Sequence, residues 1–288
     1  MENLPKVTFG IINCNRLHYL KSCIESLLVS TDDYHNKEII IVDNASVEDG
    51  TDEYLLEKEK QGIKVHKTKK RDPNNEFAKA LNYIIRESTG DFVAAIQGDM
   101  QFILQSGWLH EYVKFYSEYL DHTGCIMLDA QRSQRNKSQS KFYEPIGKDY
   151  PFFYDMSRMP FCCSADVMYS RQSLEFMGPF LEKNEGHETG VNSEDNMRKR
   201  LTDKLSSLDN RSVFCAMPKI SPAVAIFTDK RGTNARVRGN KRYGDYWAPK
   251  ESFKYYKIRT LEEMKKISVN SELPIGIEKT AIAIGWDL

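Results

Sequence analysis

Residues 7–46 decide the fold, and they read VTFGIINCNRLHYLKSCIESLLVSTDDYHNKEIIIVDNAS. Val7 to Ile12 is an apolar run rich in β-forming residues. Apolar side chains then recur at helical spacing, at Leu17, Leu20, Ile24, Leu27 and Leu28. Glu38 to Asp43 is a second apolar run. The stretch therefore predicts a strand, a helix and a second strand.

The same alternation continues toward the middle of the chain. We expect a helix from Asp49 to Lys60, a short strand from Ile63 to His66 and a fourth strand from Asp91 to Ile96. Between the last two strands a helix carries Phe77, Ala78, Leu81, Ile84 and Ile85, with Asn74 or Asn75 available as its cap. Apolar strands that alternate with amphipathic helices are typical of a parallel sheet covered on both faces. Residues 1 to about 125 are therefore expected to form a doubly wound α/β unit.

The second half of the chain has a looser pattern. Apolar segments around 165–169 and 213–216 predict a mixed α/β half packed against the first. Between Lys230 and Arg242 there are six basic residues and no acid, which indicates a mobile basic loop. A helix from about Glu251 to Ile267 and a strand from Thr280 to Trp286 are expected to close the chain.

Composition excludes several classes of protein. The 288 residues include 41 basic and 41 acidic side chains, so the net charge is zero and no nucleic-acid partner is expected. The sequence contains no run of about 18 apolar residues, so no transmembrane segment is predicted. Met1 to Lys6 lacks the layout of a signal peptide, and a cytoplasmic location is therefore expected. The absence of G-x-G-x-x-G and G-K-[ST] removes the main support for a dinucleotide oxidoreductase or a P-loop ATPase.

Polar side chains follow three of the predicted strands. The segments are Asn13-Cys14-Asn15-Arg16, Asp43-Asn44-Ala45-Ser46 and Gln97-Gly98-Asp99. In an open parallel sheet, ligands bind beyond the carboxyl ends of the strands. For any one of these residues a turn or helix cap is the simpler interpretation, but together they predict a site at this edge.

An ordered set of such segments resembles a family 2 glycosyltransferase of the GT-A fold. The segments are Val7–Asn15 with Arg16 and Leu20, Ile39–Ser46 with Asp49-Gly50-Thr51, Phe77–Asn82, Gly90–Asp99, Gly107-Trp108-Leu109, Ala165–Phe180 and Ser193–Leu201. The resemblance implies an α/β fold of GT-A type, with a Rossmann-like, mostly parallel sheet, helices on both faces and a mixed acceptor-side half. Residues 1–125 would bind the nucleotide-sugar, 126–228 would bind the acceptor and carry the catalytic base, and 229–288 would hold the basic loop, C-terminal helix and strand.

The resemblance also implies roles for single residues. Asp43 would contact the base of a nucleotide-sugar, which is expected to be UDP-linked, and Asp99 would ligate Mn²⁺ or Mg²⁺ at the donor diphosphate. Asp195, with Glu194 as the alternate, would be the general base that deprotonates the acceptor hydroxyl and inverts the anomeric carbon. The remaining donor-site residues would be Asn13, Asn15, Asn44, Ser46, Asn82, Gln97, Gly98, Arg236 and Arg238. The partners would be a nucleotide-sugar donor and a glycan or glycoconjugate acceptor.

Two features depart from the family pattern. Gln97 stands where the family usually has the first acid of a D-x-D motif, and the last histidine, His187, precedes the segment with the base. The remaining metal ligands are therefore open. Arg236 and Arg238 could stabilise the leaving diphosphate instead, or belong to a solvated charge run. A glycosyltransferase-like binding or scaffold protein without turnover, a nucleotidyltransferase and a nucleic-acid binder are the alternatives.

Overall fold

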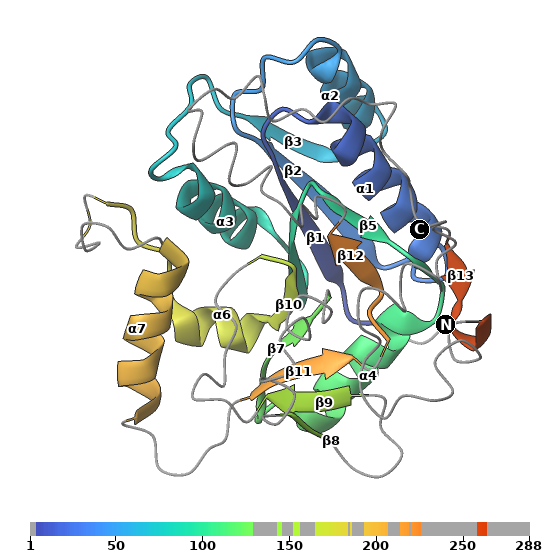
Figure 1. The fold of residues 1–288 in the computed structure, drawn as a ribbon, viewed down its shortest axis with the longest axis vertical. Coiled ribbons are helices and arrows are strands. Elements are labelled where there is room, and N and C mark those ends of the chain that lie inside the picture. The colour runs from blue at the N-terminus through green and yellow to red at the C-terminus, as the bar shows by residue number, and fades with distance from the viewer. Residues whose placement is uncertain are drawn as a thin grey trace, which may run out of the picture.

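The computed structural model describes residues 4–128, 143–145, 152–155, 165–183, 185, 193–206, 214–218, 220–225 and 258–263. Within these residues the centre of the molecule is a nine-stranded sheet in the order β3-β2-β1-β4-β10-β7-β11-β9-β8 (Figure 1). Two short two-stranded sheets, β12-β5 and β13-β6, accompany it. No helix in this part of the chain has the length and hydrophobicity needed to cross a membrane.

The first half of the chain folds as the sequence predicts. Its elements are β1 (Val7–Asn13), α1 (Leu17–Ser30), β2 (Lys37–Asp43), α2 (Thr51–Lys60), β3 (Lys64–Lys67), α3 (Glu76–Glu87) and β4 (Phe92–Gln97). The four strands are all parallel, because β1 pairs with both β2 and β4 and β2 pairs with β3. Their carboxyl ends therefore share one edge of the sheet.

The second half is mixed, as expected. Its elements are β5 (Met100–Phe102), β6 (Leu104–Gln105), α4 (Trp108–Tyr119), β7 (Thr123–Met127), β8 (Tyr143–Pro145), β9 (Phe152–Asp155), β10 (Val167–Ser170), α6 (Arg171–Met177), α7 (Ser193–Ser206), β11 (Phe214–Pro218), β12 (Ala223–Ala225) and β13 (Arg259–Thr260). Strand β10 lies antiparallel between β4 and β7. One sheet thus runs across residue 125, and a functional division at that point stays a prediction.

Successive side chains of the strands point to opposite faces of the sheet, and apolar side chains form a core on each face. Val7, Phe9 and Ile11 of β1 join a buried cluster with residues of α1, α2 and α4. Ile40 and Val42 of β2 join a second cluster with residues of α3, α6 and α7. Figure 1 shows α1 and α3 on opposite sides of β1 and β2. The expected cover of helices on both faces is confirmed, and it follows from the period-two pattern of apolar side chains.

The C-terminal helix predicted from Glu251 to Ile267 is wrong in part. Arg259 and Thr260 form β13, which pairs with β6, so a helix does not run through them. Residues 261–263 are helical, and Thr260 and Glu263 exchange hydrogen bonds as a capping box. The capping pattern in Thr260-Leu261-Glu262-Glu263 is the signal that the periodicity argument overlooked. The predicted basic loop of 230–242 and the strand of 280–286 lie outside the described residues.

The cap of α3 differs from the predicted one in its contacts. Asn75 is the N-cap residue, but its side chain makes no capping hydrogen bond. Its amide oxygen instead accepts a hydrogen bond from the backbone N–H of Lys183, at 2.9 Å. Asn75 therefore links the start of α3 to the segment that follows α6.

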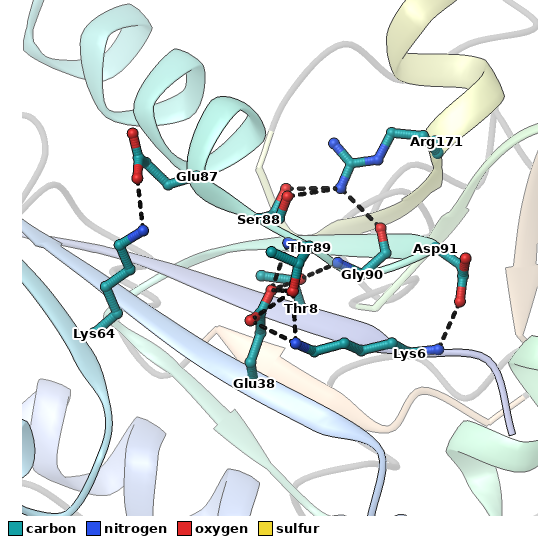
Figure 2. Close-up of polar contacts among 10 residues, drawn as sticks. All are labelled: Lys6, Thr8, Glu38, Lys64, Glu87, Ser88, Thr89, Gly90, Asp91 and Arg171. Carbon is teal, nitrogen blue, oxygen red and sulfur yellow. Dashed lines mark hydrogen bonds and ion pairs between the residues drawn. The ribbon is translucent and has the colours of Figure 1, made fainter.

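A polar network closes the edge of the sheet where the parallel strands begin (Figure 2). The Glu38 carboxylate accepts hydrogen bonds from the Thr8 hydroxyl at 2.6 Å and from the Thr89 backbone N–H at 2.6 Å. Lys6 Nζ lies 2.9 Å from the same carboxylate. The Arg171 guanidinium donates to the carbonyl oxygens of Ser88 and Gly90 at 3.2 and 2.8 Å. These contacts tie the amino ends of the strands together and leave the carboxyl edge for a site.

Candidate functional site

Two loops lock together where β1 and β2 end. Asp43 is fully buried, and its Oδ1 accepts hydrogen bonds from Asn13 Nδ2 at 2.8 Å and from Ser46 Oγ at 2.5 Å. Its Oδ2 accepts the backbone N–H of Ser46 at 2.9 Å. The structure thus brings three of the predicted donor-site residues together, and in this arrangement the Asp43 carboxylate organises the loops from within.

Asn15 extends the same network. Its backbone N–H donates to Ser46 Oγ at 2.6 Å, and its side-chain oxygen accepts the backbone N–H of Val47 at 2.8 Å. Asn15, Arg16 and Ala45 have positive φ angles of 54°, 57° and 50°. Such strained conformations in non-glycine residues persist only where the surroundings hold them, and they concentrate at functional sites.

A cavity of about 130 Å³ opens beside these loops. Predicted donor-site residues contribute to its lining from all three strand ends, namely Asn13, Asn44, Gln97, Gly98 and Asp99. A side chain at Gly98 would crowd β1, because an added Cβ would lie 3.2 Å from the Ile12 carbonyl oxygen. The carboxyl edge of the parallel strands therefore gathers the polar residues as the sequence predicts.

Asp99 has one satisfied and one unsatisfied oxygen. Its Oδ2 lies 3.2 Å from Arg16 Nη1, whereas Oδ1 is buried and has no hydrogen-bond partner among the described residues. A buried carboxylate oxygen without a partner is costly and fits a cation ligand. Cys14 lines the same cavity, and burial raises the pKa of its thiol to about 11, so it offers no thiolate at neutral pH. The donor set is oxygen-based and suits Mg²⁺ or Mn²⁺.

The rest of a metal site is not evident in the described residues. They contain no group of three or more His, Cys, Asp or Glu side chains placed to hold a metal ion. The oxygen donors that line the cavity are Asn13, Asn44, Glu76, Gln97 and Asp99, and Glu76 also forms an ion pair with Arg71 at 2.7 Å. A cation held there would depend on donor phosphate oxygens to complete its coordination, as Mg²⁺ commonly does.

Asp166 is a buried acid beside this cavity that the sequence did not single out. Its two carboxylate oxygens accept the backbone N–H of Gln97 at 3.0 Å and the side-chain Nε2 of Gln97 at 3.1 Å. Asp166 comes just before β10, and β10 is antiparallel to β4, so the start of one strand meets the end of the other. That meeting depends on long-range strand pairing, and no short motif reports it.

Asn82 lies apart from these residues. Its side chain donates to the Phe180 carbonyl oxygen at 2.8 Å and accepts the Phe180 backbone N–H at 2.9 Å. It lines a separate cavity of about 800 Å³ between α3 and α6. In the structure Asn82 joins α3 to the segment after α6, and a role in donor binding stays a prediction.

The two candidate bases lie in the first turn of α7. Asp195 is about half exposed and forms an ion pair with Arg198 at 2.5 Å. Arg200 donates to the Pro179 carbonyl oxygen at 2.5 Å, and Leu201 is buried. The end of the Ser193–Leu201 segment therefore packs α7 against the residues that follow α6. Glu194 is partly buried beside Asp195. Arg236 and Arg238 lie outside the described residues.

Comparison with known proteins defines the class to which this arrangement belongs. The mannosyltransferase PcManGT from Pyrobaculum calidifontis, solved with GDP-Man and Mn²⁺, superposes with a TM-score of 0.51 at 18% identity over 85% of this chain and 64% of that one. TarS 1-349 from S. aureus superposes with a TM-score of 0.50 at 17% identity over 74% of this chain and 57% of that one. A further TarS crystal, which contains UDP, has a TM-score of 0.50 at 15% identity over the same shares. These structures establish a GT-A glycosyltransferase fold.

The chain belongs to glycosyl transferase family 2, whose sequence profile matches residues 8–178. The curated "Uncharacterized protein y4gI" of Sinorhizobium fredii (strain NBRC 101917 / NGR234) is 33% identical over 126 residues, which cover 44% of this chain and 13% of that protein. The chain therefore spans less than two thirds of each of these relatives.

Proposed function

We propose that this chain transfers a sugar from a UDP-linked nucleotide-sugar to a hydroxyl of a glycan or glycoconjugate, with inversion at the anomeric carbon. The observation that carries the proposal is the convergence of Asn13, Asn44, Gln97 and Asp99 on one cavity at the carboxyl edge of the parallel strands. That edge is where open α/β sheets bind ligands. The TarS structure with UDP and the PcManGT structure with GDP-Man support a nucleotide-linked donor.

The cavity suits the diphosphate end of such a donor. Its volume of about 130 Å³ is small, and its lining combines amides, the carboxylates of Glu76 and Asp99, and the Arg16 guanidinium. Asp99 is the residue that would hold a divalent cation, since its Oδ1 is buried and has no partner in the described part of the chain. Such a cation, when bound, neutralises negative charge on the leaving diphosphate. Arg16 lies beside the same carboxylate and can donate charge-assisted hydrogen bonds to phosphate oxygens.

We propose Asp195 as the general base, with Glu194 as the alternate. The Asp195 carboxylate is about half exposed at the first turn of α7, where an acceptor hydroxyl can reach it. Taking the hydroxyl proton as the oxygen attacks the anomeric carbon is the step that a carboxylate base supplies in an inverting transfer. Arg198 holds the side chain at the start of the helix, and the contact between Arg200 and Pro179 holds the helix itself.

A donor-binding protein without turnover is the second candidate, and one contact favours it. Arg16 pairs with Asp99, and Gln97 supplies no charge where a second acid would strengthen metal binding. If this pair persists with donor present, Arg16 replaces the metal as the counter-charge. The two candidates then differ in turnover and in metal dependence.

Release of nucleoside diphosphate from a panel of UDP- and GDP-sugars, with and without Mn²⁺, tests the proposal. Asp99→Asn should lower turnover about 100-fold and remove its dependence on Mn²⁺. Asp195→Asn should lower kcat by about 100- to 10,000-fold while donor affinity is unchanged. Asp121→Asn changes an exposed carboxylate after α4 and serves as the control for charge. Donor binding without turnover in the unchanged chain would instead establish the second candidate.

A further inference from the structure

Asp166 makes two hydrogen bonds with Gln97. Asp166 comes just before the start of β10, and Gln97 is the last residue of the neighbouring strand β4. Asp166 is 5% exposed, and its two oxygens accept the backbone and side-chain N–H groups of Gln97 at 3.0 and 3.1 Å. Its own backbone N–H donates to the Ala95 carbonyl oxygen at 2.6 Å, and its carbonyl oxygen accepts the Leu128 N–H at 2.9 Å. Backbone and side chain of Asp166 are therefore both fixed against β4 and β7.

This contact determines which end of the Gln97 amide is available to the cavity. An ionised carboxylate has no proton to donate, so it pairs with the amide nitrogen and not with the amide oxygen. With Nε2 held by Asp166 at 3.1 Å, the oxygen Oε1 is the remaining acceptor of the Gln97 side chain, and it has no hydrogen bond to another described residue. Gln97 lines the same cavity as Asp99, whose Oδ1 is buried without a partner among the described residues.

The backbone at Asp166 is unfavourable for an ordinary residue. Its φ angle is +66°, in the region that favours glycine and is tolerated by aspartate and asparagine. Such a conformation is unfavourable in a residue other than glycine and persists only where its surroundings hold it. A carboxylate at this position, where glycine would be strain-free, indicates that the side chain itself is required.

We infer that Asp166 is a positioning residue, which holds the Gln97 carboxamide with its oxygen beside Asp99 so that the two form a pair of oxygen ligands for a divalent cation. The inference rests on the proposed function. It accounts for Gln97 at the position where the family usually has the first acid of its D-x-D motif. Asp166, just before the neighbouring strand β10, supplies the negative charge that Gln97 lacks. Gln97 then contributes a neutral oxygen to the cation, and the buried Asp166 carboxylate accepts a hydrogen bond from the nitrogen of the same amide.

The experiment measures Mn²⁺ binding in the presence of UDP by the loss of the free-Mn²⁺ signal in electron paramagnetic resonance. Asp166→Asn keeps a residue that tolerates positive φ, but its amide can turn the Gln97 side chain around. We expect the Mn²⁺ dissociation constant to rise about tenfold, as for other residues that support metal ligands. Asp91→Asn removes the same charge at the opposite end of β4 and should leave Mn²⁺ binding unchanged.

A reciprocal variant separates positioning from a purely structural role. Combining Asp166→Asn with Gln97→Glu reverses the pair, because the new amide donates to the new carboxylate and the charge moves into the cavity. We expect Mn²⁺ affinity at or above that of the unchanged chain. If the single variant does not fold, as judged by thermal unfolding, the double variant decides the question.

The outcomes distinguish the inference from the proposed function. Unchanged Mn²⁺ affinity in a folded Asp166→Asn chain, or a folded double variant that fails to recover Mn²⁺ binding, would overturn the role of Asp166 and leave the proposed function standing. Failure of the unchanged chain to bind Mn²⁺ with UDP, or UDP itself, would overturn the metal-assisted function as well.

Discussion

Asp43 is the residue that holds together the two loops that follow β1 and β2. It is fully buried and accepts hydrogen bonds from Asn13 Nδ2, Ser46 Oγ and Ser46 N. Asp43→Asn replaces one accepting oxygen with an NH₂ group, which would face the N–H or O–H groups that now donate to Asp43. The NH₂ group repels these donors and leaves at least one of them without a hydrogen bond. We expect the free energy of unfolding to fall by about 1–3 kcal/mol in urea denaturation, with donor affinity falling in parallel.

Asp49→Asn is the matched control for this prediction, because Asp49 is exposed on the same loop. Its effect on the free energy of unfolding should stay within about 0.5 kcal/mol. A loss of donor affinity in Asp43→Asn with unchanged stability would contradict the organising role and make Asp43 solely a contact to the nucleotide base.

At this scale the sequence predicts which residues gather and not how they pair. Polar residues after apolar parallel strands must meet at one edge, so the neighbourhood of Asp43, Gln97 and Asp99 follows from the pattern. Asp166 could not be found in this way, because its place depends on the antiparallel insertion of β10. The ion pair of Arg16 with Asp99 also depends on a left-handed backbone at Arg16, which residue type does not report.

At the scale of the elements, a single residue, Gly10, determines how closely α3 packs against β1. A Cβ added at Gly10 would lie 2.2 Å from Ile84 Cγ2, so the helix can approach the strand only because position 10 has no side chain. We expect Gly10→Ala to lower the free energy of unfolding by about 1–3 kcal/mol, since overpacking forces α3 to shift. Thermal or urea denaturation measures this loss.

The double variant Gly10→Ala with Ile84→Ala tests the cause. Ile84→Ala alone should also destabilise the chain, because Ile84 is fully buried and leaves a cavity. If the clash is responsible, the two changes together should cost clearly less than their sum. Simple additivity would show that Gly10 acts through something other than contact with Ile84.

Elements with strong periodicity were predictable, and those set by tertiary contacts were not. The helices from 17 and from 76 and the strands β1, β2 and β4 follow from apolar spacing alone. The helix predicted from Glu251 failed at Arg259 and Thr260, because strand pairing with β6 overrides a weak helical pattern. The capping box of Thr260 and Glu263 shows that a helix begins after this strand.

For the whole molecule, the Glu38 network links pH to stability. Burial by itself would raise the pKa of Glu38, but hydrogen bonds from Thr8, Lys6 and Thr89 outweigh it and lower the pKa from 4.5 to about 2. The stabilisation is therefore present above pH 4.5 and is lost as the pH falls toward 2. Because the side chain is partly exposed, we expect a contribution of about 1–2 kcal/mol.

Urea denaturation between pH 6 and pH 2.5 measures this contribution. The unchanged chain should lose stability more steeply over this range than Glu38→Gln, which should already be weaker at pH 6. Parallel pH profiles for the two proteins would show that other carboxylates govern the acid sensitivity.

The fold gathers Asn13, Asn44, Gln97 and Asp99 at the carboxyl edge of the sheet and the Glu38 network at the opposite edge. We propose that the carboxyl edge binds a nucleotide together with a divalent cation. Calorimetric titration of the unchanged chain with UDP, GDP and their sugars, each with Mn²⁺ and with EDTA, tests it most directly. We expect micromolar binding that prefers UDP-linked ligands and requires Mn²⁺. Failure of every nucleotide to bind would contradict the site, and equally tight binding in EDTA would contradict the role given to Asp99.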